Sequence, residues 1–173
     1  MNRLTPIAAV AAVAVLLAAL GSVRAEEATS ATATEAAPAV TKSGHVEANG
    51  VNYFYRIYGE GEPLLLLHGG LGSIDMFAPL LPILAEDRQV IGVDLQGHGR
   101  TALGDRPISL IDMGDDMAAI LKELGYGQVD ALGYSMGAGV AFRLAVQHPE
   151  TVRRLALVSA GFSQDGFYPE TLP

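Results

Sequence analysis

The sequence predicts an α/β protein, in which a mostly parallel sheet carries helices on both faces and an N-terminal hairpin lies beside it. The first observation is that short apolar segments of strand type alternate with longer segments of helical spacing over residues 64–158. Such alternation is typical of a parallel sheet whose crossovers are helices. The second is the dipeptide Asn49-Gly50 between two strand-like segments. It supplies the positive φ angles that a tight hairpin turn needs.

The individual elements follow from local composition and spacing. Leu64–Leu67 is an unbroken apolar run, which suits a strand buried on both faces. Residues 110–124 have apolar side chains at helical spacing. Pro79 and Pro82 place breaks or a first turn inside the helix expected at 76–86. In chain order, we expect strands at 45–48, 51–58, 64–67, 89–93, 129–132 and 155–158, and helices at 76–86, 110–124 and 136–147.

Several polar residues come directly after expected strands. Right-handed crossovers would place the carboxyl ends of the parallel strands along one rim of the sheet. We therefore expect His68, Asp94, Ser135 and Ser159 to gather at that rim. Open α/β sheets bind their ligands there.

Charge and cysteine content exclude some classes of partner and site. The 173 residues carry a net charge of −8. An acidic chain of this kind argues against a nucleic-acid partner. The absence of cysteine excludes disulfides and a lipidated cysteine. The four histidines are dispersed, so no ligand spacing favours a metal, and we expect no cofactor.

The N-terminus has the layout of a secretory signal peptide. A short charged start precedes the uncharged apolar run Ile7–Leu20, and Val23-Arg24-Ala25 offers a cleavage site after Ala25. A membrane anchor is the alternative, but the run is shorter than the ~20 residues that span a bilayer. We expect residues 1–25 to be removed, residues 26–43 to form a flexible linker, and the folded domain to occupy 44–173. The product would be exported, periplasmic or secreted, without a stable membrane anchor.

The motif Gly133-Tyr134-Ser135-Met136-Gly137 has the pattern G-x-S-x-G, with a strand-like run before it and a helix-like segment after it. Glycines at both flanks permit the close backbone approach of a sharp strand-to-helix turn. Such a turn exposes the serine hydroxyl. We interpret Ser135 as a candidate nucleophile; an ordinary tight turn is the alternative.

A serine nucleophile that attacks a carbonyl needs hydrogen-bond donors for the oxyanion that forms. The N–H of Met136 is one candidate, because it lies at a helix N-terminus, where N–H groups are unpaired and the helix dipole favours negative charge. The glycine-rich segment His68–Gly72 offers the second donor. We choose the N–H of Gly70, with Leu71 in reserve; a plain strand-to-helix turn is the alternative.

The chain resembles the α/β-hydrolase superfamily from Gly44 to about Tyr168. The resemblance rests on four segments in order: HGGLG at 68–72, DLQGHGRT at 94–101, GYSMG at 133–137 and QHPETVRRLALVS at 147–159. It implies a serine hydrolase for a small-molecule, ester-like substrate. Esterases, lipases, lactonases, C–C hydrolases and cofactor-free haloperoxidases remain open. Epoxide hydrolases and haloalkane dehalogenases of this fold have an Asp nucleophile, so Ser135 disfavours them.

The family's triad runs Ser, acid, His, and this chain departs from it. His148 closes the helix that starts after Ser135 and would lie ~20 Å away, beyond the reach of a general base. His98 lies on the correct rim, where the resemblance implies a structural histidine more often than a substitute base. We expect His68 to bond nearby backbone and His45 to lie on the surface. Asp165 follows the last strand, where some relatives carry their acid, but without a histidine to orient we expect it to be a solvated loop acid. Asp94 is expected to cap a loop.

The resemblance implies that a family member continues past Pro173 with a lid, two more strands and the missing acid and histidine. We therefore expect an incomplete α/β-hydrolase fold that alone is inactive or very weak. An incomplete gene record and a truncated product remain open. So do a non-catalytic remnant that binds a ligand or partner and a half that complements a separate chain. Residues 155–158 would form an exposed apolar edge and permit self-association.

Overall fold

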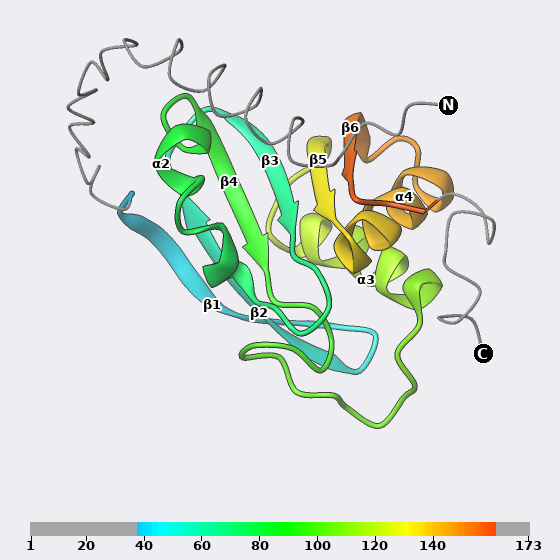
Figure 1. Cartoon of the computed structure of the whole chain (residues 1–173). Coiled ribbons are helices and arrows are strands. Elements are labelled where there is room, and N and C mark those ends of the chain that lie inside the picture. Colours follow the sequence, from blue (N-terminus) through cyan, green and yellow to red (C-terminus); the bar gives the residue numbers. More distant parts are fainter. Residues whose placement is uncertain (1–37, 162–173) are drawn as a thin grey trace, which may run out of the picture. The chain divides into compact units, whose positions relative to one another are not determined.

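The computed structural model describes residues 38–161. They form a six-stranded sheet in the order β1-β2-β4-β3-β5-β6, with helices packed on it (Figure 1). Strands β3 to β6 run parallel, and β2 pairs antiparallel with both β1 and β4. The predicted α/β class with a mostly parallel sheet is confirmed. The signal peptide expected at 1–25, most of the expected linker and Asp165 lie outside the described residues.

The N-terminal hairpin forms where it was expected. Strands β1 (Val40–Ala48) and β2 (Val51–Tyr58) flank a turn in which Asn49 and Gly50 have φ angles of 48° and 85°. The expected start of the folded domain at Gly44 is too late, because β1 already begins at Val40. Its first residues pair with the end of β2, and the Thr41 hydroxyl donates a hydrogen bond to the Ile57 carbonyl at 3.1 Å.

The parallel strands are somewhat longer than their apolar runs suggested. They span Glu62–Leu67 (β3), Arg88–Val93 (β4), Val129–Tyr134 (β5) and Val152–Val158 (β6). Leu64 to Leu67 are all buried, as expected for a strand covered on both faces. Leu65 and Leu67 belong to one hydrophobic cluster, and Leu64 and Leu66 to another, in agreement with the period-2 alternation of a strand.

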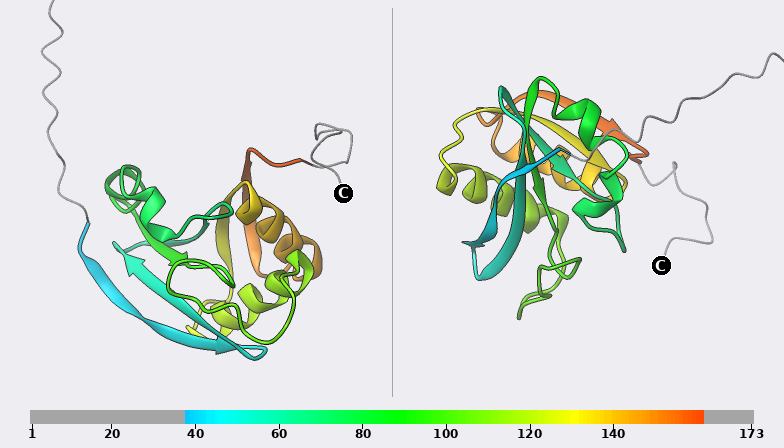
Figure 2. Two further views of the ribbon diagram at one scale, coloured as in Figure 1. Left: turned by 60° about the horizontal axis from the view of Figure 1, so that its bottom comes forward. Right: turned by 90° about the vertical axis from the view of Figure 1, so that its left-hand side faces the viewer.

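One face of the sheet is covered by two long helices, α3 (Leu110–Glu123) and α4 (Met136–Gln147). They pack against each other, and α4 also packs on β3, β5 and β6 (Figure 2). The hydroxyl of Ser109 caps α3 by accepting the Asp112 N–H. Because β5 leads directly into α4, the start of α4 lies at the carboxyl ends of the parallel strands.

The opposite face carries shorter helical pieces than predicted. The expected helix at 76–86 is replaced by a 3-10 turn, η1 (Ile74–Phe77), and a single α-helical turn, α2 (Leu81–Leu84). Pro79 and Pro82 lack the N–H groups that a continuous helix needs at those positions, and this interrupts it. The two pieces still cover the sheet, because Ile74, Phe77 and Leu81 pack in the second hydrophobic cluster. Helices on both faces are thus confirmed.

Within residues 38–161, no helix has both the length and the apolar character required to cross a membrane.

Candidate active site

Ser135 lies at a sharp bend between β5 and α4. Its φ and ψ angles are 51° and −113°, a region that a non-glycine residue occupies at a cost of about 1–3 kcal/mol. The bend is held by β6, because the Ser135 N–H donates to the Val158 carbonyl at 2.8 Å. The side chain makes no capping hydrogen bond to α4, and the residue is exposed. The predicted elbow geometry is therefore present.

The two glycines of the motif are required by backbone contacts. A Cβ on Gly133 would collide with the Gly137 carbonyl oxygen, and a Cβ on Gly137 would collide with the carbonyl oxygens of Leu67 and His68. Helix α4 thus begins directly against the end of β3. This contact lifts Ser135 out of the sheet and brings it beside the loop that follows β3.

The first turn of α4 leaves N–H groups available beside Ser135. The N–H groups of Ala138 and Gly139 bond to the Ser135 carbonyl at 3.0 and 3.2 Å. The N–H of Met136, the first residue of the helix, has no intrahelical partner by geometry and lies at the positive end of the helix dipole. The location expected for the first oxyanion donor is therefore present, and its role stays a prediction.

The glycine-rich loop after β3 lies against the elbow. A Cβ placed on Gly69 would be 2.9 Å from Tyr134 Cδ1 and 3.4 Å from Ser135 Cβ. Gly70 is exposed, with no atom within 4 Å of its hypothetical Cβ. Leu71 has a φ of 60° and a fully exposed side chain. The loop is thus open to a ligand beside Ser135, and Gly70 as the second donor stays a prediction.

His68 is a structural residue of this loop. Its ring is buried, its Nε2 accepts the Leu95 N–H at 2.9 Å, and its Nδ1 lies 2.7 Å from the Gly69 carbonyl oxygen. Nε2 accepts, so the proton is on Nδ1, which donates. Burial lowers the pKa of His68 and outweighs the opposing effect of the Gly69 carbonyl. Both nitrogens are occupied, in agreement with the expected backbone-binding role.

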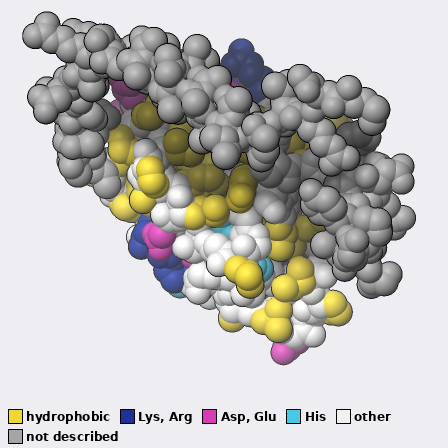
Figure 3. Space-filling model, viewed as in Figure 1, with side chains coloured by type: hydrophobic (Ala, Val, Ile, Leu, Met, Phe, Trp, Pro, Cys, Tyr) yellow, Lys and Arg dark blue, Asp and Glu magenta, His cyan; other side chains and the backbone are white. Residues whose placement is uncertain are grey.

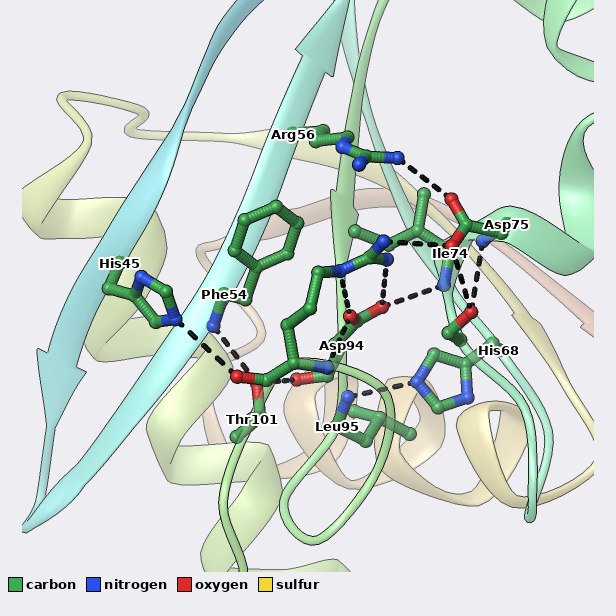
Figure 4. A network of polar contacts seen from close by, with 11 residues as sticks. His45, Phe54, Arg56, His68, Ile74, Asp75, Asp94, Leu95 and Thr101 are labelled. Atoms are coloured by element: carbon green, nitrogen blue, oxygen red, sulfur yellow. Dashed lines mark hydrogen bonds and ion pairs between the residues drawn. The ribbon is translucent and has the colours of Figure 1, made fainter.

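Asp94 is buried at the end of β4 and caps loops, as predicted (Figure 4). Its carboxylate accepts the Ile74 N–H at 2.7 Å and the Arg100 N–H at 2.9 Å. The Arg100 guanidinium also pairs with it, and Arg100 lies over the Phe54 ring. The ion pairs of Arg100 with Asp94 and with Asp75 were not predicted from the sequence, although the DLQGHGRT segment contains the arginine.

The other histidines of residues 38–161 form their hydrogen bonds with groups other than Ser135. His148 Nε2 pairs with Asp115 Oδ1 at 2.8 Å, at the far end of a helix of 12 residues that is about 18 Å long. His98 Nδ1 lies 2.9 Å from the Gln96 carbonyl oxygen, and His45 Nε2 lies 3.4 Å from the Arg100 carbonyl oxygen. In the described part of the chain, no hydrogen bond joins a histidine to the Ser135 hydroxyl.

Two hollows flank the helical face. One of about 540 Å³, bordered by Asp115, Lys122 and His148, lies at the amino ends of the parallel strands, away from Ser135. A second, of about 420 Å³, begins at Ala138 and Gly139 in the first turn of α4. Hydrophobic side chains are exposed on the face drawn in Figure 3. Residues 38–161 contain no group of three or more metal-binding side chains.

The geometry agrees with a comparison against protein families. Residues 62–173 match the model of the alpha/beta hydrolase fold. The chain belongs to the α/β-hydrolase family. The mostly parallel sheet with helices on both faces agrees with this family.

Similar proteins of this family perform different hydrolytic reactions. The α/β-hydrolase is 37% identical over 110 residues to the 2-hydroxymuconate semialdehyde hydrolase of Pseudomonas sp. (strain CF600), covering 61% of this chain and 39% of that protein. It is 34% identical over 113 residues to the soluble epoxide hydrolase of Corynebacterium sp. (strain C12), covering 64% and 38%.

Among solved structures, Est816, described as an N-acyl homoserine lactone degrading enzyme, matches with a TM-score of 0.68 and 31% identity, over 73% of this chain and 49% of that one. The α/β-hydrolase thus spans less than half the length of each of these three relatives.

Proposed function

We propose that this α/β-hydrolase is a serine hydrolase that cleaves an ester or related acyl bond of a small molecule. The observation that carries the proposal is the strained, exposed Ser135, which lies between the N-terminus of α4 and the glycine-rich loop. Its hydroxyl makes no capping bond, so it is free to meet a substrate. The hydrolase name of the Pseudomonas relative and the description of Est816 as a lactone degrading enzyme support this proposal.

In the proposed reaction, Ser135 Oγ attacks the substrate carbonyl and its proton passes to a base. The carbonyl oxygen becomes an oxyanion, held by the N–H groups of Met136 and Gly70. Collapse of this intermediate breaks the bond to the leaving oxygen, which takes the proton from the base and departs as the alcohol, and an acyl-serine remains. Water, deprotonated by the same base, attacks the acyl-serine; the acid is released and the proton returns to Ser135 Oγ. Removal of one such donor typically lowers the reaction rate by about 10²–10³-fold. None of the histidines in residues 38–161 is placed by a hydrogen bond to act as that base.

The test is prolonged covalent labelling of the purified chain with an excess of a fluorophosphonate probe, because a serine without a hydrogen-bonded histidine reacts slowly, and peptide mass analysis then locates the label. We expect the label on Ser135 and its loss in Ser135→Ala. Ser159→Ala is the matched control, because Ser159 is also exposed, also follows a strand at this rim and also has a positive φ, of 55°. Labelling that survives in Ser135→Ala would refute the assignment.

A catalytically inactive chain that only binds a ligand or partner is the second candidate. The lack of a hydrogen-bonded histidine at Ser135 in residues 38–161 favours it. The three triad residues act as a unit. An oxyanion hole without them still gives a reaction rate about 10³-fold above that in water. Turnover of p-nitrophenyl acetate by the pure chain, abolished in Ser135→Ala, would reject this candidate. Epoxide opening is less favoured, since the resemblance assigns that reaction to an Asp nucleophile.

We also propose that the protein is exported, with residues 1–25 removed. The support is the apolar run Ile7–Leu20 followed by Val23-Arg24-Ala25. Expression in a bacterial host and N-terminal sequencing of the product test this. A mature chain that begins at Glu26 is expected, and a chain that retains Met1 in the membrane fraction would contradict it.

A further inference from the structure

The end of β4 holds both ends of the glycine-rich loop. At the first end, His68 Nε2 accepts the N–H of Leu95 at 2.9 Å. At the other end, Asp94 Oδ1 accepts the N–H of Ile74 at 2.7 Å. Asp94 and Leu95 are consecutive residues, so one short piece of backbone fixes the two ends of the segment 69–73 (Figure 4).

Between these two attachments, Gly69 is buried close to Tyr134, but the residues that follow it have little packing. Gly70 has no neighbours around its Cβ position, and the Leu71 side chain is fully exposed. One internal bond, from the Gly72 N–H to the Gly69 carbonyl at 3.2 Å, closes the turn. The position of the Gly70 N–H therefore depends on the attachments at His68 and Ile74 rather than on side-chain packing within the loop.

Asp94 is itself held by a charged cluster. Arg100 donates from its backbone N–H and its Nε to Asp94 Oδ2, at 2.9 and 2.8 Å. The same guanidinium bonds Asp75, the residue after Ile74, at 2.8 Å, and Asp75 also pairs with Arg56 at 2.7 Å. Partial burial would raise the pKa of Asp75, but the hydrogen bonds and charges of Arg100 and Arg56 outweigh it and lower that pKa.

We propose that Asp94 is a positioning residue, which sets the glycine-rich loop, and with it the oxyanion donor of Gly70, against Ser135. Asp94 does not touch the substrate. Its carboxylate bonds both the Ile74 N–H, at the start of η1, and Arg100. Loss of one carboxylate oxygen therefore releases the loop at its Ile74 end. The structural part of this inference stands on the contacts alone, and only its effect on reactivity rests on the proposed function.

The test compares Asp94→Asn with Asp116→Asn in the full chain. Both carboxylates are completely buried, and each pairs with one arginine. Asp116 lies on α3 and bonds Tyr53, Asn49 and Arg106, with no bond to the glycine-rich loop. Asp116→Asn is therefore a control for general destabilisation. In Asp94→Asn an NH2 donor replaces one of the two oxygens. It then faces either the backbone N–H and Nε of Arg100 or the Ile74 N–H, so donors meet on one side and the bond there is lost.

Hydrogen exchange of the peptide covering residues 68–77 is the first readout. Because a charge-assisted bond is lost, we expect the Ile74 amide to exchange about tenfold faster or more in Asp94→Asn. In Asp116→Asn we expect this peptide to change no more than the peptides of the rest of the sheet do, because any effect there comes from overall stability. Equal exchange of this peptide in the two variants would overturn the inference.

The second readout is the rate of fluorophosphonate labelling at Ser135. A displaced oxyanion donor should slow labelling about tenfold or more in Asp94→Asn, and labelling in Asp116→Asn should stay near that of the unmodified chain. An unmodified chain that fails to label contradicts the proposed function, while the exchange result still decides the positioning role. If Asp94→Asn does not fold, Arg100→Lys replaces it, and unchanged exchange over 68–77 in that variant overturns the inference.

Discussion

At the scale of single residues, the elbow depends on the missing side chains of Gly133 and Gly137. Each has a backbone carbonyl oxygen where a Cβ would lie. The contact cannot relax by a rotamer change, since backbone atoms of β3 and α4 form it. The motif is therefore required by the packing of α4 on the sheet as well as by any chemistry at Ser135.

This makes Gly137→Ala a severe change. We expect it to lower the free energy of unfolding by about 3 kcal/mol or more, as for other backbone collisions in a packed interior. Gly127→Ala is the matched control, because Gly127 is exposed and nothing lies near its Cβ position; its effect should stay within about 1 kcal/mol. Urea unfolding of the two variants measures both values. A loss below about 1 kcal/mol in Gly137→Ala would contradict the observed contact.

His68 should stay neutral to a lower pH in the folded protein than in the unfolded chain, with its proton on Nδ1. Burial lowers its pKa, whereas an unfolded histidine titrates near pH 6.5. Below that pH only the unfolded state binds the proton, so the free energy of unfolding falls as the pH decreases from about 6.5 toward the lowered pKa. Nitrogen chemical shifts of the ring across this range provide the measurement. A ring that gains its second proton at or above pH 6.5 would contradict the prediction.

How much of the site was predictable differs from residue to residue. Ser135 and its glycines could be found because the elbow is encoded locally, by a strand, a turn and a helix in succession. The partners of Asp94 could not be found from the sequence. Ile74 lies 20 residues away in the chain, and Asp75, the second partner of Arg100, lies 25 residues away from it. No sequence spacing specifies that meeting.

At the scale of elements, the strands and long helices were predicted well, and the errors have physical causes. The apolar runs in β3 to β5 and the spacing in α3 report burial directly. Residues 40–43 looked like linker because they carry no apolar pattern. They form a strand because the backbone of β2 is available for pairing, and this depends on the partner strand rather than on their own side chains.

The amino ends of the parallel strands are joined by Asp130 of β5. It bonds Arg153 at 2.9 Å and Arg88 at 2.8 Å. Through these bonds, Arg153 first, its pKa is lowered to about 2. The stabilisation is present above the unfolded pKa, about 3.9, and is lost as the pH falls toward about 2.

Accordingly, Asp130→Asn should be less stable than the original chain at neutral pH, and the difference should shrink between about pH 4 and pH 2. Denaturant unfolding at several pH values measures this. The control is Asp105→Asn, at an exposed loop position, where the effect should stay within about 0.5 kcal/mol at every pH. A stability gap for Asp130→Asn that stays constant down to pH 2 would show that its charge makes no contribution.

At the scale of the whole described sheet, the two edges differ in their protection. β1 carries mostly polar, exposed residues and an irregularity in its pairing between Val40 and Lys42, features that discourage further pairing. β6 has Arg153 and Arg154 near its start, and its second half is the apolar run 155–158. In the described residues, one side of β6 pairs with β5 and the other side is the edge of the sheet.

We therefore expect the purified chain to self-associate through β6. Leu155 and Leu157 are 37% and 40% exposed on this strand, and an open apolar edge favours pairing with another copy. A charge at the edge opposes such pairing, so Leu157→Lys should lower the average molar mass measured by light scattering over a range of concentrations. Ser43→Lys places the same charge on exposed β1 and should leave the mass unchanged. A chain that is monomeric at all concentrations, or one in which both substitutions act equally, would contradict an interface at β6.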